Sequence, residues 1–132
     1  MESQKVDVLL LSSWYPNRKD RLDGNFVQNQ VMASSPFDRI KVLFATSYPI
    51  QDTYEFELIE HTNYSELYVY FKYHSSRVIR FWRKLRAYQL GLKRIGHFDL
   101  IHANIFFNIG IFALILSLIY RKPLVLTEHS SQ

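Results

Sequence analysis

A glutamate and a histidine follow directly on an apolar run near the end of the chain. Glu128 and His129 come after Leu124 to Thr127, which has the composition of a buried strand. A carboxylate beside an imidazole can hydrogen-bond a sugar hydroxyl or hold an acid or base proton. The other interpretation is a turn pair that its own backbone satisfies. His102 lies inside a second apolar run, where a ring nitrogen bonded to the backbone is the simpler interpretation.

A single glycine follows the first apolar run. Gly24, with Asn25 beside it, precedes Phe26 to Ala33, whose apolar residues recur at helical spacing. A glycine at a helix N-terminus lets backbone N–H groups approach an anion closely, whereas the alternative is a loop glycine that needs a positive φ. The chain contains neither G-x-x-x-x-G-K-[ST] nor G-x-G-x-x-G. Kinase, P-loop and NAD-binding classes are therefore disfavoured.

Basic residues are concentrated in one segment. The chain has 16 lysines and arginines against 12 acidic residues, but Lys72 to His97 holds eight of the basic residues and no acidic one. The rest of the chain is net acidic, so the basicity forms a patch that would attract an anionic partner. We expect contact with a membrane or another anionic surface through four side chains: Arg80, Arg83, Lys84 and Arg86. The other interpretation is that these side chains form a solvated outer face.

Composition excludes several classes of protein. The 132 residues suffice for one domain with a single core. No cysteine is present, which excludes disulfide scaffolds, thiolate catalysis and cysteine-based metal centres. No histidine spacing indicates a metal site, so we expect no metal and no cofactor. The start of the chain shows no secretory signal, which favours a cytoplasmic protein.

These residues need a scaffold, and the hydrophobic pattern predicts an α/β one. Four apolar runs are typical of strands buried on both faces of a parallel sheet: Lys5 to Ser12, Arg39 to Thr46, Phe98 to Ala103 and Leu124 to Thr127. Glu55 to Glu60 and Tyr64 to Lys72 alternate apolar with polar residues and predict a hairpin at the sheet edge. In open sheets of this kind, ligand sites form at the carboxyl ends of the strands.

Two further helices complete the predicted fold. Arg77 to Ile95 is amphipathic and is closed by Gly96, and its apolar stripe comprises Val78, Leu85, Leu92 and three aromatic residues, Phe81, Trp82 and Tyr88. Because these rings are expected in the core, base stacking and nucleic-acid binding are disfavoured. Phe106 to Tyr120 predicts a buried helix, since Ile105 to Tyr120 is shorter than the roughly 18 residues of a membrane span.

Three segments together resemble the N-terminal domain of the group-1, or family 4, glycosyltransferases of GT-B fold. LLLSSWYPN followed by DGNFVQNQ resembles the family's first strand, its S-x-W-Y-P loop and the G-x-F that begins its first helix. FDLIHAN resembles the family's D-[LIV]-I-H-[AG]-[HN] strand, and PLVLTEHSS its next strand, which ends in a histidine turn. The order and spacing of the three match over most of the chain.

The resemblance implies a Rossmann-like parallel sheet and a retaining, metal-independent transfer of a sugar from a nucleotide-sugar. In this family the N-terminal domain mainly binds the acceptor, which can be a glycan, a lipid-linked sugar or a small molecule. A C-terminal domain holds the donor nucleotide through an E-x7-E segment, which this chain lacks. We therefore expect residues 1 to 132 to be an incomplete N-terminal domain without activity of its own. Cell-surface polysaccharide synthesis at the inner face of the plasma membrane is the setting that fits.

Motif matching assigns roles to individual residues. His129 matches the histidine that contacts the transferred sugar, which makes it the expected catalytic residue. Gly24 matches the loop glycine near the donor phosphates, and Asn25 and Glu128 stand beside these two positions. Asn104 occupies a place where many relatives have histidine, a departure from the family pattern. The alternative to a transferase is a standalone α/β binding module that uses the basic helix as its contact surface.

Overall fold

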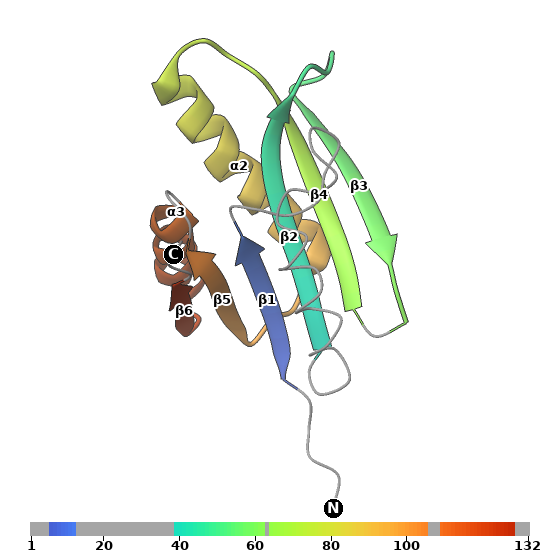
Figure 1. Ribbon diagram of the computed structural model, residues 1–132, viewed down its shortest axis with the longest axis vertical. Coiled ribbons are helices and arrows are strands. Elements are labelled where there is room, and N and C mark those ends of the chain that lie inside the picture. The colour runs from blue at the N-terminus through green and yellow to red at the C-terminus, as the bar shows by residue number, and fades with distance from the viewer. Residues whose placement is uncertain (1–5, 13–38, 63, 106–108, 129–132) are drawn as a thin grey trace, which may run out of the picture.

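The computed structural model describes residues 6–12, 39–62, 64–105 and 109–128 (Figure 1). In this part of the chain, the elements follow one another as strands β1 (Asp7–Ser12), β2 (Arg39–Tyr48), β3 (Tyr54–Glu60) and β4 (Tyr64–Lys72), helix α2 (Arg77–Ile95), strand β5 (Leu100–Ile105), helix α3 (Ile109–Tyr120) and strand β6 (Leu124–Glu128). The helix expected over Phe26 to Ala33 lies outside the described residues.

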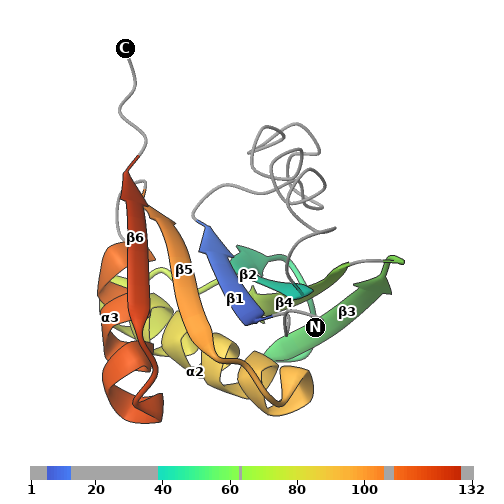
Figure 2. The same ribbon diagram turned by 90° about the horizontal axis from the view of Figure 1, so that it is seen from below.

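The six strands form one sheet in the order β3-β4-β2-β1-β5-β6. The pairs β2–β1, β1–β5 and β5–β6 are all parallel, which confirms that the four predicted aliphatic strands are neighbours. Their carboxyl ends consequently lie at one edge, as the arrowheads of β1, β5 and β6 show in Figure 2. The molecule has the Rossmann-like α/β architecture that its hydrophobic pattern predicts.

The hairpin lies at the sheet edge, as predicted. Strand β3 is antiparallel to β4, and β4 is parallel to β2. The outermost strand is only half-buried and carries acidic residues, including Glu57 and Glu60. Charged side chains on an edge strand discourage pairing with a second molecule.

Helix α2 has the predicted bounds because both of its ends are capped. The Oγ atom of Ser76 accepts a hydrogen bond from the N–H of Ile79, and Gly96 closes the helix at a φ of 81°. Leu85, Tyr88 and Leu92 are buried against the sheet. The prediction was wrong for two residues of the apolar stripe, since Val78 and Trp82 are 65% and 59% exposed.

Both exposed residues lie in the first two turns of α2. The stripe from Leu85 onward is buried, and Figure 1 shows the start of the helix beyond the tips of β1 and β5 but level with the end of β2. A hydrophobic repeat alone cannot reveal which of its residues the neighbouring elements cover.

Helix α3 is only half-buried, which corrects the expectation of a buried helix. Ile109, Phe112, Ala113 and Leu116 face the core. Leu118 is 71% exposed, and Ile111, Leu114 and Ile119 are about half exposed. A helix that lies on one face of a sheet can bury only one side. None of the helices in the described ranges is long and apolar enough to span a bilayer.

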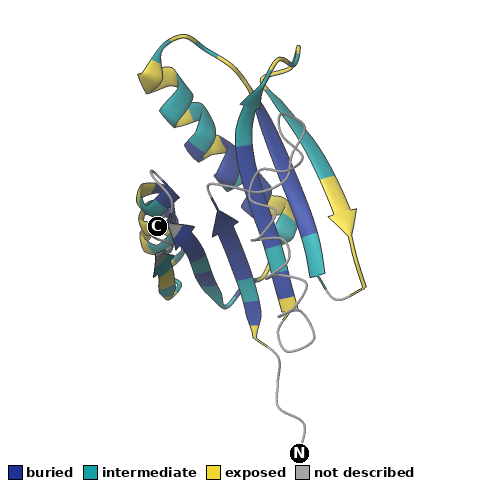
Figure 3. Cartoon of the chain, viewed as in Figure 1, coloured by how far each residue is buried: buried dark blue, intermediate teal, exposed yellow. Residues whose placement is uncertain are grey.

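Buried side chains form two clusters, one on each face of the sheet. The larger cluster joins alternate strand residues such as Leu9, Leu43 and Val69 to both helices, and Figure 2 shows α2 and α3 on the same side. The smaller cluster lies on the other face and includes Leu10, Val42 and Tyr70. Most of β1 and the middle parts of β2 and β4 are dark in Figure 3, so the sheet has a closely packed centre.

Candidate functional site

A row of three polar residues crosses the carboxyl ends of neighbouring strands. Ser12 of β1 is in register with Asn104 of β5, which is in register with Thr127 of β6. Paired residues of parallel strands direct their side chains to the same face. This face is opposite α2 and α3, because the alternate residues Leu11 and Ala103 belong to the helix-side cluster. The row combines two hydroxyl groups with an amide, all of which can donate and accept hydrogen bonds.

Burial distinguishes this row from ordinary strand termini. Ser12 is 1% and Asn104 is 3% exposed, and both belong to the few buried polar residues of the described chain. Polar groups are retained at such positions only when hydrogen bonds compensate for lost solvation. Asn104 therefore lies at the predicted edge, held firmly by its surroundings.

His102 has a side-chain partner on the neighbouring strand. Its Nε2 atom lies 2.6 Å from Oγ1 of Thr127, so this ring nitrogen is paired. The contact links β5 to β6 through Thr127, a member of the polar row. Sequence reasoning missed it because Thr127 is 25 residues away, and the pairing register that joins them is not visible in the sequence.

Two of the five residues assigned to the sheet edge fall within the described chain. Asn104 is the second-last residue of β5, near the edge predicted for it, and the backbone of Glu128 ends β6 in register with Ile105. Gly24, Asn25 and His129 lie outside the described residues. Convergence of Gly24, Asn104, Glu128 and His129 on one cleft stays a prediction.

The four basic residues expected on a solvated helix face are not equally exposed. Arg86 is exposed, whereas Arg80, Arg83 and Lys84 are half-buried. The Nη1 atom of Arg83 donates to the carbonyl oxygen of Lys72 at 2.8 Å, and Nη1 of Arg80 donates to the carbonyl oxygen of His74 at 2.8 Å. These contacts anchor the segment between β4 and α2, so the basic residues also have a structural role.

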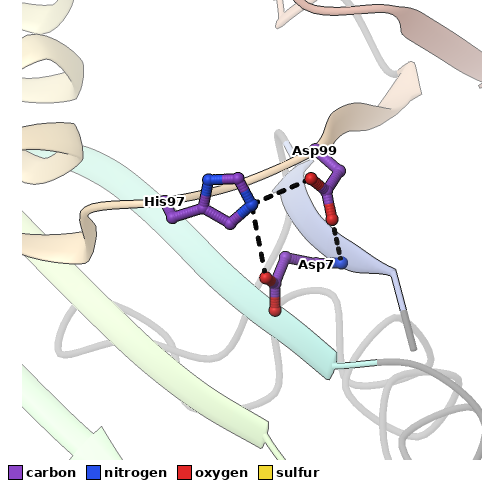
Figure 4. A group of neighbouring side chains, drawn as sticks. All are labelled: Asp7, His97 and Asp99. Carbon is purple, nitrogen blue, oxygen red and sulfur yellow. Dashed lines mark hydrogen bonds and ion pairs between the residues drawn. The ribbon is translucent and has the colours of Figure 1, made fainter. Parts of the chain in front are cut away.

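A second polar cluster lies at the opposite, amino-terminal edge of the sheet (Figure 4). Oδ2 of Asp99 accepts a hydrogen bond from the backbone N–H of Asp7 at 2.8 Å, and Nε2 of His97 lies 2.8 Å from Oδ1 of Asp99. The backbone N–H of Asp7 holds the pKa of Asp99 below its ordinary value, and His97 acts in the same direction. Arg39 donates from Nε to Oδ1 of Asp7 at 2.6 Å.

This cluster ties three strands together at their starts. Asp7, His97 and Asp99 are near enough to one another to bracket a metal ion. The guanidinium of Arg39, however, already forms an ion pair with Asp7. A clamp between β1, β2 and the segment before β5 accounts for these contacts. The sequence offered one signal for it, an aspartate within the first aliphatic run, where a charge needs a partner.

Comparison with models of known protein families finds no match for the chain, and comparison with curated protein sequences finds none either. The class of protein that the fold defines is the Rossmann-like α/β proteins, whose ligands bind at the carboxyl ends of the strands.

Proposed function

We propose that this chain forms the acceptor-side domain of a retaining glycosyltransferase that uses a nucleotide-sugar donor. One observation supports the proposal above the others. The described parts of the three segments that resemble the glycosyltransferase motifs lie in or beside β1, β5 and β6, which are adjacent in the sheet and end at one edge. Strands separated by about a hundred residues in the chain are thus neighbours, which supports a shared site for the motifs that follow them.

The proposed chemistry distributes roles among the edge residues. His129 and Glu128 orient the transferred sugar through its hydroxyl groups and stabilise charge that develops as the phosphate leaves. The backbone at Gly24 and Asn25 meets phosphate oxygens. Asn104 holds a hydroxyl of the acceptor or the transferred sugar. Such groups accelerate transfer only where their hydrogen bonds are stronger in the transition state than with bound substrate.

The remaining parts of the proposal concern partners and setting. The donor nucleotide binds mainly to a second domain, and the acceptor is a glycan, a lipid-linked sugar or a small molecule. No metal and no cofactor takes part. The transferase works on the cytoplasmic side of the plasma membrane, in cell-surface polysaccharide synthesis, and residues 1 to 132 alone do not catalyse transfer.

A donor screen tests this proposal. The complete reading frame that contains this chain is incubated with a panel of uridine and guanosine diphosphate sugars, and release of the nucleoside diphosphate is measured. We expect release from at least one donor, unaffected by EDTA, and a fall of about tenfold or more in the Asn104→Ala variant. Asn104→Asp is the matched control, because aspartate has nearly the same size as asparagine but lacks its amide N–H donors. Absence of turnover with every donor and acceptor tried would contradict the proposal.

A further inference from the structure

A cavity of about 530 Å³ lies at the carboxyl ends of β2 and β4, between these strands and the amino-terminal parts of α2 and α3. Ser47 and Phe71 contribute to it from the strands, and three cations contribute from α2: Arg77, Arg80 and Lys84. Phe71 belongs to the helix-side cluster, so the cavity is on the opposite face from Asn104. It is therefore distinct from the polar row of Ser12, Asn104 and Thr127.

The cations of this cavity share one side of α2. Positions 77, 80 and 84 are separated by three and four residues, the spacing that aligns side chains along a helix. No acidic residue is among the described residues that line the cavity. The first turn of α2 also has no acidic residue, although the positive end of the helix dipole would favour one. Positive charge is thus concentrated where the backbone is itself electropositive.

Arg80 is fixed in place without being neutralised. Its Nη1 atom donates to the carbonyl oxygens of His74 and Ser75, at 2.8 and 3.1 Å, and lies 3.3 Å from the hydroxyl of Tyr73. All three acceptors are uncharged. Within the described ranges Arg80 forms no ion pair with a carboxylate, and Arg77 forms neither an ion pair nor a side-chain hydrogen bond. A guanidinium held in this way is preorganised for an anion.

The inner wall of the cavity is aromatic. The rings of Phe81 and Phe112 stack with their centroids 5.0 Å apart, and Phe71 is 3% exposed. Nζ of Lys84 lies 5.3 Å from the centroid of Phe112, so charge and ring surface adjoin. A ligand that fills this space needs an anionic group for the arginines and an apolar body for the rings.

We propose that this cavity binds an organic phosphate, with the phosphate at Arg77 and Arg80 and an apolar group against Phe81 and Phe112. Planar guanidinium groups match phosphate oxygens in geometry and charge. The phosphate can belong to a soluble ester or to a lipid headgroup. The proposal does not depend on transferase activity, since it concerns equilibrium binding on the other face of the sheet.

Phenyl phosphate is a suitable probe because it combines both features of the ligand. Its binding to the purified chain is measured by calorimetry beside inorganic phosphate and phenol. We expect phenyl phosphate to bind more tightly than either one, since each lacks one half of the recognition. Equal or undetectable binding of all three would overturn the proposal.

Arg77→Gln is the decisive variant. Arg77 makes no side-chain hydrogen bond or ion pair within the described chain, so its loss should leave the fold intact. We expect the Kd for phenyl phosphate to rise about tenfold, the scale of one charge-assisted hydrogen bond. Lys93→Gln, which removes the same charge from an exposed position near the end of α2, should leave the Kd nearly unchanged. An equal effect of both variants would reduce the interaction to non-specific charge attraction and overturn the proposal.

Vesicles distinguish the two sources of phosphate. If phosphatidylglycerol vesicles displace phenyl phosphate from the wild type but do not bind the Arg77→Gln variant, the ligand of the cavity is a lipid headgroup. Failure of phosphatidylglycerol to compete, with phenyl phosphate still bound through Arg77, would assign it to a soluble ester. Phosphatidylcholine vesicles control for membrane contact without net charge.

Discussion

Nε2 of His102 and Oγ1 of Thr127 lie 2.6 Å apart, and their contact joins the last two strands of the sheet just below its carboxyl edge. Strand β6 is an edge strand in the described sheet, paired with β5 alone. The contact therefore fixes the strand that ends at Glu128 and precedes His129 in the chain. The geometry of the proposed site depends on the contact between His102 and Thr127 because that contact holds β6 in place.

A double-mutant cycle of His102→Ala and Thr127→Val should measure this link. We expect each single variant to lower the free energy of unfolding by about 1 kcal/mol, and the pair to show a coupling energy of similar size. Urea denaturation followed by circular dichroism supplies the four values. Strictly additive effects would mean that the two side chains do not stabilise each other.

The amino-terminal clamp should give the protein a specific acid sensitivity. The pKa of Asp99 is lowered, chiefly by the backbone N–H of Asp7, so the folded state binds the proton of Asp99 less readily than the unfolded state does. The resulting stability is present above the ordinary pKa of 3.8 and is lost as the pH falls through the lower folded value. Asp99→Asn should therefore lose less stability than the wild type between pH 5 and the acid limit of folding. Parallel acid curves for the two proteins would contradict this role.

The hydroxyl group of Tyr88 is buried without a hydrogen-bond partner among the described residues. Burial also raises the pKa of Tyr88, because the charged phenolate would lose more solvation in the core than the neutral hydroxyl group does. Tyr88→Phe should raise the free energy of unfolding by about 1 kcal/mol, since it removes an uncompensated polar group without changing the ring. The melting temperature measures the change. A clear fall in stability would reveal a partner for the hydroxyl, such as an internal water.

Gly91 allows α2 to approach the sheet closely. A Cβ atom at this position would lie 2.5 Å from Cδ1 of Leu43, and Leu43 is completely buried. Gly91→Val should destabilise the protein by about 2 kcal/mol, because the helix would have to move away from β2. Lys93→Val introduces the same side chain at an exposed position of α2, where only helix propensity changes. At Gly91 that change alone would be slightly favourable, because valine is a better helix former than glycine. An unchanged or higher stability of Gly91→Val would show that the close approach has no energetic importance.

The sheet could be predicted from the sequence because its strands are nearly continuous aliphatic runs. Leu9 and Leu10 are both buried, which requires two covered faces and hence a central strand. The end of helix α2 could be predicted because Gly96 is a strong end signal. Aliphatic runs and helix end signals involve residues that are close together in the sequence, so they can be recognised without the structure.

Other features depend on spatial register and could not be predicted. The pairing of β4 with β2 in parallel, the link between His102 and Thr127, and the clamp of Asp7 with Asp99 all join residues from separate elements. The exposure of Trp82, at 59%, depends on which residues of α2 the neighbouring elements cover. Residues of β2, β4, α2 and α3 line the cavity at Arg77 and Arg80. The charge pattern of the sequence indicated only that a partner of this region would be anionic.

Turnover of the His129→Ala variant tests the central claim most directly, because His129 follows β6 at the proposed transfer site. The complete protein is assayed with its nucleotide-sugar donor, and kcat and the melting temperature are compared with those of the wild type. The proposed role predicts a fall in kcat of about 10²-fold or more with an unchanged melting temperature. Unchanged kcat together with an unchanged melting temperature would contradict a catalytic role for His129.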